Sequence, residues 1–160
     1  VKILNPLSSD LDVMRQTMLY SGLEAIAYNQ NRQNADIKFY EFGKVYKIQD
    51  DKYNESQRFA IFMSGASVTA QWNQKAQSAS FYNLKAIVDN ILQRLNITDV
   101  VIEDCTCKKM AYGLNYNRNN KTLVKFGKVA PAALKKADVD KDVFYADFSF
   151  DQLITIAKKK

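Results

Sequence analysis

The 160-residue sequence has no histidine, only two cysteines and only five glycines. The lack of histidine excludes Ser–His–Asp triads, Cys–His nucleophile pairs and histidine-ligated metal sites. The glycines lie far apart along the chain, so no glycine-rich loop is available to cradle a phosphate. No apolar run approaches the roughly 20 residues needed to span a bilayer, and no cleavable signal pattern is present. These absences remove the commonest catalytic and membrane-associated classes of protein.

The two cysteines, Cys105 and Cys107, form the sequence CTC. A lone pair of thiolates without histidine does not complete a tetrahedral zinc site. Residues i and i+2 of a strand share one face without the usual geometry of a disulfide. We therefore expect two reduced thiols, no metal site and a cytoplasmic location.

The composition is that of a folded module with a basic surface. Hydrophobic residues make up 47% of the sequence, which is enough apolar surface for one core, and we expect one domain over residues 1–160. We also expect Val1 and Lys160 to be boundaries inside a longer chain. The net charge of +6 favours a polyanionic partner such as RNA, but the five arginines are scattered. Because nucleic-acid faces cluster arginines for bidentate phosphate contacts, a solvated lysine surface is the preferred interpretation.

Two segments have the apolar spacing of long helices. The first runs from Thr17, the expected N-cap, to about Arg32. The second begins after Ser80, another expected N-cap, and carries a broad apolar stripe that predicts packing on a sheet. The stripe consists of Phe81, Leu84, Ile87, Val88, Ile91, Leu92 and Leu95. The segments APAALKKAD and FDQLITIAKKK predict two short helices near the end of the sequence.

The segment IKFYEFGKVYKI has the β-branched and aromatic content of a strand. Its period of two predicts one face with Tyr40, Phe42, Tyr46 and Ile48, and another with Ile37, Phe39, Glu41, Val45 and Lys47. The polar segment QDDKYNESQ predicts a long loop rather than a tight turn, followed by the returning strand RFAIFMSGA.

The last third of the sequence is mostly strand: DVVIED, MAYGLNYN, TLVKFGKV and VFYADFSF. The asparagines of NRNNK tolerate the positive φ of a hairpin turn. Helices are few and the strands mostly follow one another, so the sequence predicts an α+β fold. We expect an antiparallel sheet flanked by helices that cover one side.

Five landmarks, in order, resemble the beta chain of bacterial phenylalanyl-tRNA synthetase. They are NPLSSDLDVMRQTMLYSGLEAIAYNQNR, FYEFGKVY, the single tryptophan Trp72, SFYNLKAIVDNIL and FGKVAPAAL. Each is short, but together they cover nearly the whole chain. The sequence departs from the family pattern at Asn83, Ala86 and Ala130, where the family has aspartate, glycine and histidine.

The resemblance implies a catalytic-like module related to class II aminoacyl-tRNA synthetase catalytic domains. The hairpin of EFGKVYKI and RFAIFMSG is then similar to motif 2 of that class, which carries an arginine for the ATP α-phosphate and a glutamate near the amino group and adenine. By this resemblance, the two positions are Lys47 and Ser64. The glycine-rich, arginine-bearing third motif has no match. We therefore expect no catalytic, cofactor-binding or metal-binding residues in this chain.

The resemblance also implies a role in phenylalanine-tRNA ligase, where this module assists assembly with the catalytic alpha chain. The whole enzyme, with two alpha and two beta chains, uses ATP and Mg²⁺ to aminoacylate tRNA in the cytoplasm. The first class II motif and an editing domain would precede Val1, and an anticodon-arm-binding domain would follow Lys160. Apolar surface left uncovered in the isolated module should make it self-associate.

Two alternatives remain at this point. One is an autonomous basic RNA-binding module that stacks bases on Tyr40, Phe42 or Tyr46. We prefer to assign those aromatic residues to the core of the sheet. The other is a working ATP-dependent ligase, against which the missing motifs argue.

Overall fold

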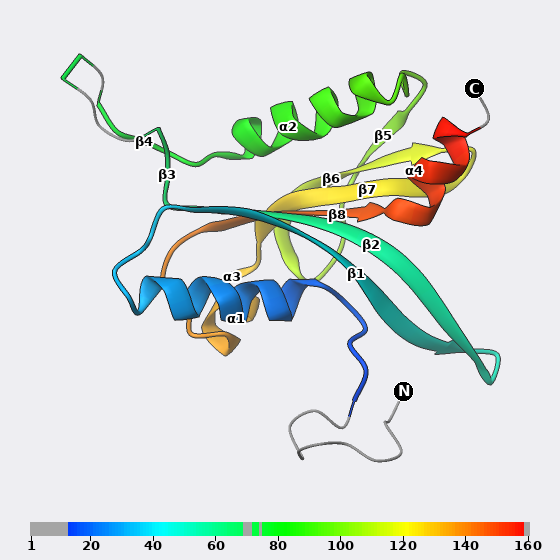
Figure 1. The fold of residues 1–160 in the computed structure, drawn as a ribbon, viewed down its shortest axis with the longest axis horizontal. Coiled ribbons are helices and arrows are strands. Elements are labelled where there is room, and N and C mark those ends of the chain that lie inside the picture. Colours follow the sequence, from blue (N-terminus) through cyan, green and yellow to red (C-terminus); the bar gives the residue numbers. More distant parts are fainter. Residues whose placement is uncertain (1–12, 69–71, 74, 159–160) are drawn as a thin grey trace.

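The computed structural model describes residues 13–68, 72–73 and 75–158 (Figure 1). Within these residues a six-stranded antiparallel sheet has the strand order β1-β2-β8-β7-β6-β5. The α+β class and the antiparallel sheet are as the sequence predicts. In sheet order the strands are β1 (Ile37–Gln49), β2 (Lys52–Ser64), β8 (Val143–Ser149), β7 (Lys121–Val129), β6 (Met110–Arg118) and β5 (Val101–Asp104). Two short strands, β3 (Ala66–Val68) and β4 (Gln77–Ser78), pair separately.

Helices cover both faces of the large sheet, not one face as expected. In Figure 1, α1 (Leu19–Gln30) and α3 (Pro131–Lys136) lie below the sheet, whereas α2 (Phe81–Arg94) and α4 (Phe150–Ala157) lie above it. The central strand β8 explains the difference, because its first four residues are all buried. A strand with both faces apolar must be covered on both sides.

The helix α1 packs its buried residues Leu19, Leu23 and Ile26 into the lower core. It begins one residue later than predicted, with Met18 rather than Thr17 at the N-cap. The Thr17 hydroxyl still accepts a hydrogen bond from the backbone N–H of Leu19 at 3.4 Å. No side-chain cap bond forms at Met18, so tertiary packing decides where this helix starts.

The helix α2 has the cap that the sequence predicts. The Asn83 backbone N–H donates to the Ser80 hydroxyl at 3.3 Å, and the Ser80 backbone N–H donates to the Asn83 side chain at 2.9 Å. This reciprocal pair is a capping box. The fully buried line is narrower than the predicted stripe, because residues four apart share one helical face. It consists of Leu84, Val88 and Leu92, and the other stripe residues are only partly buried.

The β1–β2 connection is a two-residue turn, so the predicted long loop is wrong. Asp50 and Asp51 both have positive φ, of 50° and 57°, and β2 begins directly after them. Positive φ at both central residues is the type I′ pattern that matches strand twist. The polar residues after the turn lie in a hairpin end that projects into solvent, so their polarity does not oppose strand structure.

Other local predictions are confirmed. Asn119 and Asn120 have positive φ and form the β6–β7 turn, and Pro131 begins the short helix α3. Cys105 and Cys107 are free, but they lie in the connection after β5 rather than in a strand. Among the described residues, no helix is long and apolar enough to cross a membrane.

Candidate functional site

The structure separates Lys47 and Ser64, the two positions taken from the resemblance to motif 2. Lys47 pairs with Asn54 near the hairpin turn, whereas Ser64 pairs with Ile37 at the other end. Ten residue steps along β1 separate Lys47 from Ile37, which is about 33 Å at roughly 3.3 Å per residue. The two side chains therefore do not belong to one site.

Ser64 has a structural environment. It is fully buried, and its hydroxyl donates to the backbone carbonyl of Asp142 at 3.0 Å. It also accepts a long hydrogen bond of 3.5 Å from the Gln30 side chain. Ser64 thus links the end of α1 to the segment that enters β8.

Lys47 instead lines a cleft of about 170 Å³ on the α1 side of the sheet. Three further cations line the same cleft from three other segments: Arg58 in β2, Lys109 in the connection before β6, and Lys125 in β7. Asp147 in β8 supplies the carboxylate among them. We call the cleft bounded by Lys47, Arg58, Lys109, Lys125 and Asp147 the cationic cleft.

Asp147 lies at the centre of this arrangement. Its Oδ1 atom is buried without a hydrogen-bond partner in the described residues, and the nearest ion pair is 3.8 Å from Arg58 Nη1. Burial raises the pKa of the Asp147 carboxyl, and the charges of Arg58, Lys125, Lys47 and Lys109 oppose that rise. Burial, followed by the charge of Asp147, also raises the pKa of the neighbouring Tyr145. The Asp147 carboxylate thus interacts electrostatically with all four cations but forms a close ion pair with none of them.

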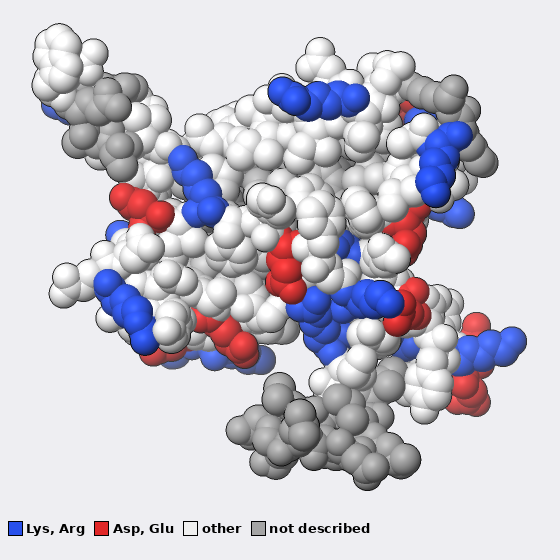
Figure 2. Space-filling model, in the orientation of Figure 1, with Lys and Arg blue, Asp and Glu red and all other residues white. Residues whose placement is uncertain are grey.

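A second arginine explains the glycine of FYEFGKVY. Arg15 crosses β1, where it donates to Glu41 Oε1 at 2.7 Å and to the Lys44 carbonyl at 2.9 Å. A Cβ atom at Gly43 would overlap the Arg15 guanidinium and press on Met18. Figure 2 shows Lys and Arg side chains gathered over this part of the molecule, with Asp and Glu beside them. Sequence reasoning missed Arg15, although a lone glycine in a strand signals a close approach.

The opposite face of β1 carries exposed aromatic residues, which corrects their assignment to the core. Tyr40 is 68% exposed and Phe42 is 55% exposed. Phe42 stacks on Phe59 with ring centroids 4.5 Å apart and meets Phe150 edge-on at 5.0 Å. We call Tyr40, Phe42, Phe59 and Phe150 the aromatic surface. It stays open because β1 is an edge strand, whereas α2 and α4 lie over the middle of the sheet (Figure 1).

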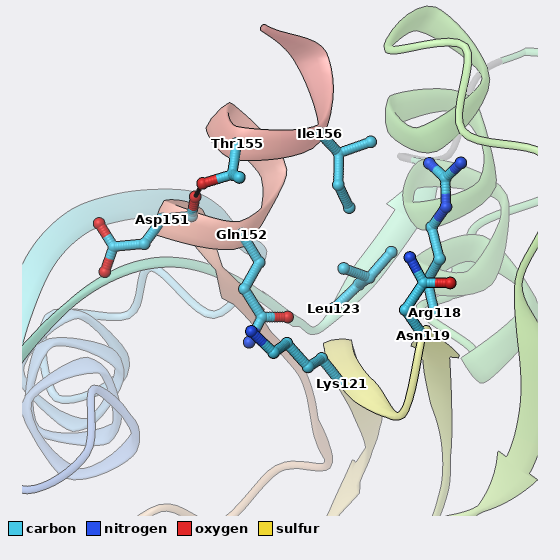
Figure 3. Close-up of a pocket in the computed structure, with 8 residues that line it drawn as sticks. All are labelled: Arg118, Asn119, Lys121, Leu123, Asp151, Gln152, Thr155 and Ile156. Atoms are coloured by element: carbon cyan, nitrogen blue, oxygen red, sulfur yellow. Dashed lines mark hydrogen bonds between the residues drawn. The ribbon is translucent and has the colours of Figure 1, made fainter. Parts of the chain in front are cut away.

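A larger cavity of about 480 Å³ lies between the β6–β7 turn and α4 (Figure 3). Leu123 and Ile156 face each other across it, while the Gln152 side chain extends toward Lys121. The Arg118 guanidinium points away along the cavity wall and pairs with Asp99 at 2.8 Å. No acid and base converge here among the described residues, so this cavity offers packing surface rather than a reaction centre.

Relatives in sequence are beta subunits of phenylalanine–tRNA ligase. The chain is 40% identical to the subunit of Bacteroides thetaiotaomicron over 166 residues, covering 96% of this chain and 20% of the relative. It is 29% identical to the subunit of Thermotoga maritima, covering 100% of this chain and 20% of the relative. The chain therefore spans about one fifth of the length of these curated relatives.

Solved structures identify the same architecture. A pyrrolysyl-tRNA synthetase of Desulfitobacterium hafniense matches with a TM-score of 0.67 at 11% identity, over 91% of this chain and 50% of that one. Identity this low shows the fold alone, and the expected class II synthetase-like fold is confirmed. Residues 1–150 match the family model described as phenylalanyl tRNA synthetase beta chain CLM domain. Because that match covers most of the sequence, the chain belongs to the phenylalanyl-tRNA synthetase beta chain CLM domain family.

Proposed function

We propose that this chain is a single non-catalytic module of a phenylalanine–tRNA ligase beta subunit, which supports assembly with the catalytic alpha chain. The main support for a non-catalytic role is the small size of the cationic cleft. Its volume of about 170 Å³ is below the roughly 300–1,000 Å³ of typical small-molecule sites. ATP and phenylalanine together need more room than this cleft offers.

The charges of the cleft also support a non-catalytic role. Adenylate formation requires fixed cationic donors aimed at the α-phosphate. Arg58 faces the buried carboxylate of Asp147, and Arg15 is held by Glu41. Lys47 lacks the planar fork of an arginine, and Ser64 is buried elsewhere. In this proposal ATP, Mg²⁺ and tRNA aminoacylation belong to the whole two-alpha, two-beta enzyme in the cytoplasm.

The aromatic surface is the proposed contact with the alpha chain. Aromatic residues are enriched in the buried centres of protein interfaces. Tyr40 and Phe42 stay more than half exposed, although Phe42 meets Phe150 at the start of α4, so a partner would bury apolar area that is now in water. The contact should therefore persist when salt is raised, because salt screens charges but leaves apolar burial intact.

The exposure of the same residues favours a second candidate, RNA binding by base stacking. Stacking on exposed aromatic rings is worth roughly 1–3 kcal/mol per base. The nearby Lys44 is already paired with Glu55 at 2.6 Å, which reduces the positive charge available for phosphates. Binding through phosphates would weaken steeply with salt, unlike the apolar contact.

The test is sedimentation velocity of the chain with purified alpha chain over a concentration series at low and high salt. We expect a complex that survives high salt and that is weakened at least about tenfold by combining Tyr40→Ala with Phe42→Ala, or about 1.4 kcal/mol. Tyr82→Ala is the matched control, because Tyr82 is 77% exposed on α2, away from the aromatic surface. If the chain stays monomeric and does not bind the alpha chain at concentrations of roughly tens of micromolar, the assembly role is contradicted.

Two further measurements separate the alternatives. Salt-sensitive binding of tRNA that is lost in the same double variant supports the RNA-binding module. Calorimetry that detects saturable, micromolar binding of ATP with Mg²⁺ contradicts a non-catalytic module.

A further inference from the structure

The cationic cleft is an unusual gathering of like charges. Lys47, Arg58, Lys109 and Lys125 reach it from four separate segments, so the tertiary structure, not a local run, brings them together. With Asp147 as the carboxylate among the lining residues, four positive charges against one negative leave a local charge of +3. A surface with evenly distributed lysines would spread these charges apart rather than gather them around one hollow.

In the part of the chain that the structure describes, no close ion pair neutralises the lysines of the cleft. Among the described residues, Lys47, Lys109 and Lys125 form no ion pair within 4 Å. Lys125 lies directly across from Asp147 in the β7–β8 pairing, yet the nearest charged partner of that carboxylate is Arg58 at 3.8 Å. Lys47 and Lys125 are exposed, so water screens part of the repulsion among the four cations, but an anion bound between them would still reduce that repulsion and stabilise the arrangement.

We propose that the cationic cleft binds a phosphate-sized oxyanion, held between Lys47, Arg58 and Lys125. The volume of about 170 Å³ corresponds to about six water molecules at roughly 30 Å³ each. That space accepts a tetrahedral phosphate or a terminal phosphate group, but not a whole nucleotide. Arg58 offers a planar donor fork and the lysines offer mobile ammonium groups, which are the usual ligands of phosphate.

Asp147 sets the affinity of this site. Its carboxylate repels an incoming anion and competes with it for Arg58. Asp147→Asn keeps the shape of the side chain and removes the charge, so it should tighten anion binding. Removing a lysine should weaken binding. Opposite effects from two substitutions in one cleft distinguish a site from a general loss of fold.

The experiment is a titration of the ¹⁵N-labelled chain with inorganic phosphate at constant ionic strength, with chloride as the compensating ion. We expect saturable shifts of the Arg58 and Lys125 amide signals, with a Kd on the order of 1 mM. The double variant Lys47→Ala, Lys125→Ala should weaken binding at least about tenfold, while Asp147→Asn should tighten it severalfold. The control, Lys135→Ala with Lys136→Ala, removes the same charge from α3, outside the cleft lining, and should change nothing.

A parallel titration with glycerol 3-phosphate identifies the source of the oxyanion. Saturation by inorganic phosphate alone assigns the site to the free ion, and saturation by both assigns it to terminal phosphate groups as well. Three results would overturn the proposal. They are equal shifts of the amide signals in a titration with chloride, an equal loss of phosphate affinity in the control variant, and no gain of phosphate affinity from Asp147→Asn. None of these titrations includes the alpha chain, so their results neither support nor contradict the proposed assembly role.

Discussion

Replacing Leu84 by alanine tests how α2 is seated on the sheet. Leu84 has no exposed surface and belongs to the upper core with Val88, Leu92 and Phe126. The substitution removes three carbon atoms, or about 2.4 kcal/mol of transfer free energy at roughly 0.8 kcal/mol per carbon. A residual cavity of about 50 Å³ adds roughly 1.2 kcal/mol at about 24 cal/mol per Å³. The expected loss in free energy of unfolding is therefore roughly 3–4 kcal/mol.

Ile91→Ala is the matched comparison on the same helix. Ile91 is only partly buried, so its truncation loses less transfer free energy and opens no closed cavity. We expect about 1 kcal/mol from Ile91→Ala, below the roughly 2–5 kcal/mol expected when the residue is taken as fully buried. Both substitutions introduce alanine, which has the highest helix propensity, so neither destabilises α2 through helix propensity.

Urea unfolding followed by far-ultraviolet circular dichroism measures both losses. The urea dependence of the free energy should stay constant across the variants, because the surface exposed on unfolding hardly changes. A loss below about 1 kcal/mol for Leu84→Ala would refute the reasoning, since it would place that side chain outside the core. A larger loss for Ile91→Ala than for Leu84→Ala would refute the assignment of the buried face.

Three further predictions concern the cap of α2, the glycine of β1 and the buried carboxyl. Ser80→Ala removes the capping box and should lower the free energy of unfolding by about 1 kcal/mol in the same urea assay, whereas Ser80→Gly should lower it by only a few tenths. Gly43→Ala should destabilise by no more than about 1 kcal/mol, because its Cβ meets only the flexible ends of Arg15 and Met18, which can move aside, and combining it with Arg15→Ala should cost less than the sum of the two single losses. Burial raises the folded-state pKa of Asp147, so its contribution to stability is fully present below the unfolded pKa of about 3.9 and is lost as pH rises through the folded pKa. The free energy of unfolding, measured against pH, should show this decline, and the decline should be smaller in Asp147→Asn. An unchanged slope of free energy against pH in that variant would mean that another group titrates.

Local features of the fold follow directly from the order of residues. Ser80 with the apolar spacing after it specifies α2, and its cap forms between neighbours in the chain. Asn119 and Asn120 specify the β6–β7 turn because asparagine tolerates positive φ. Period-two alternation placed Tyr40 and Phe42 on the face of β1 opposite Val45. In each case the deciding interaction lies within a few residues or within the conformational preference of one residue.

Features that depend on distant segments needed the tertiary structure. The alternation in β1 separates its two faces, but whether Tyr40 and Phe42 are buried depends on where α2 and α4 lie. The resemblance assigned Lys47 and Ser64 to one motif, yet the strand register places them at opposite ends of one hairpin. The sequence by itself determined the helices, most of the strands, the class and the family landmarks. Only the pairing of β2, β8 and β7 decided that Arg58, Asp147 and Lys125 meet, because contacts between residues far apart in the chain depend on register and packing.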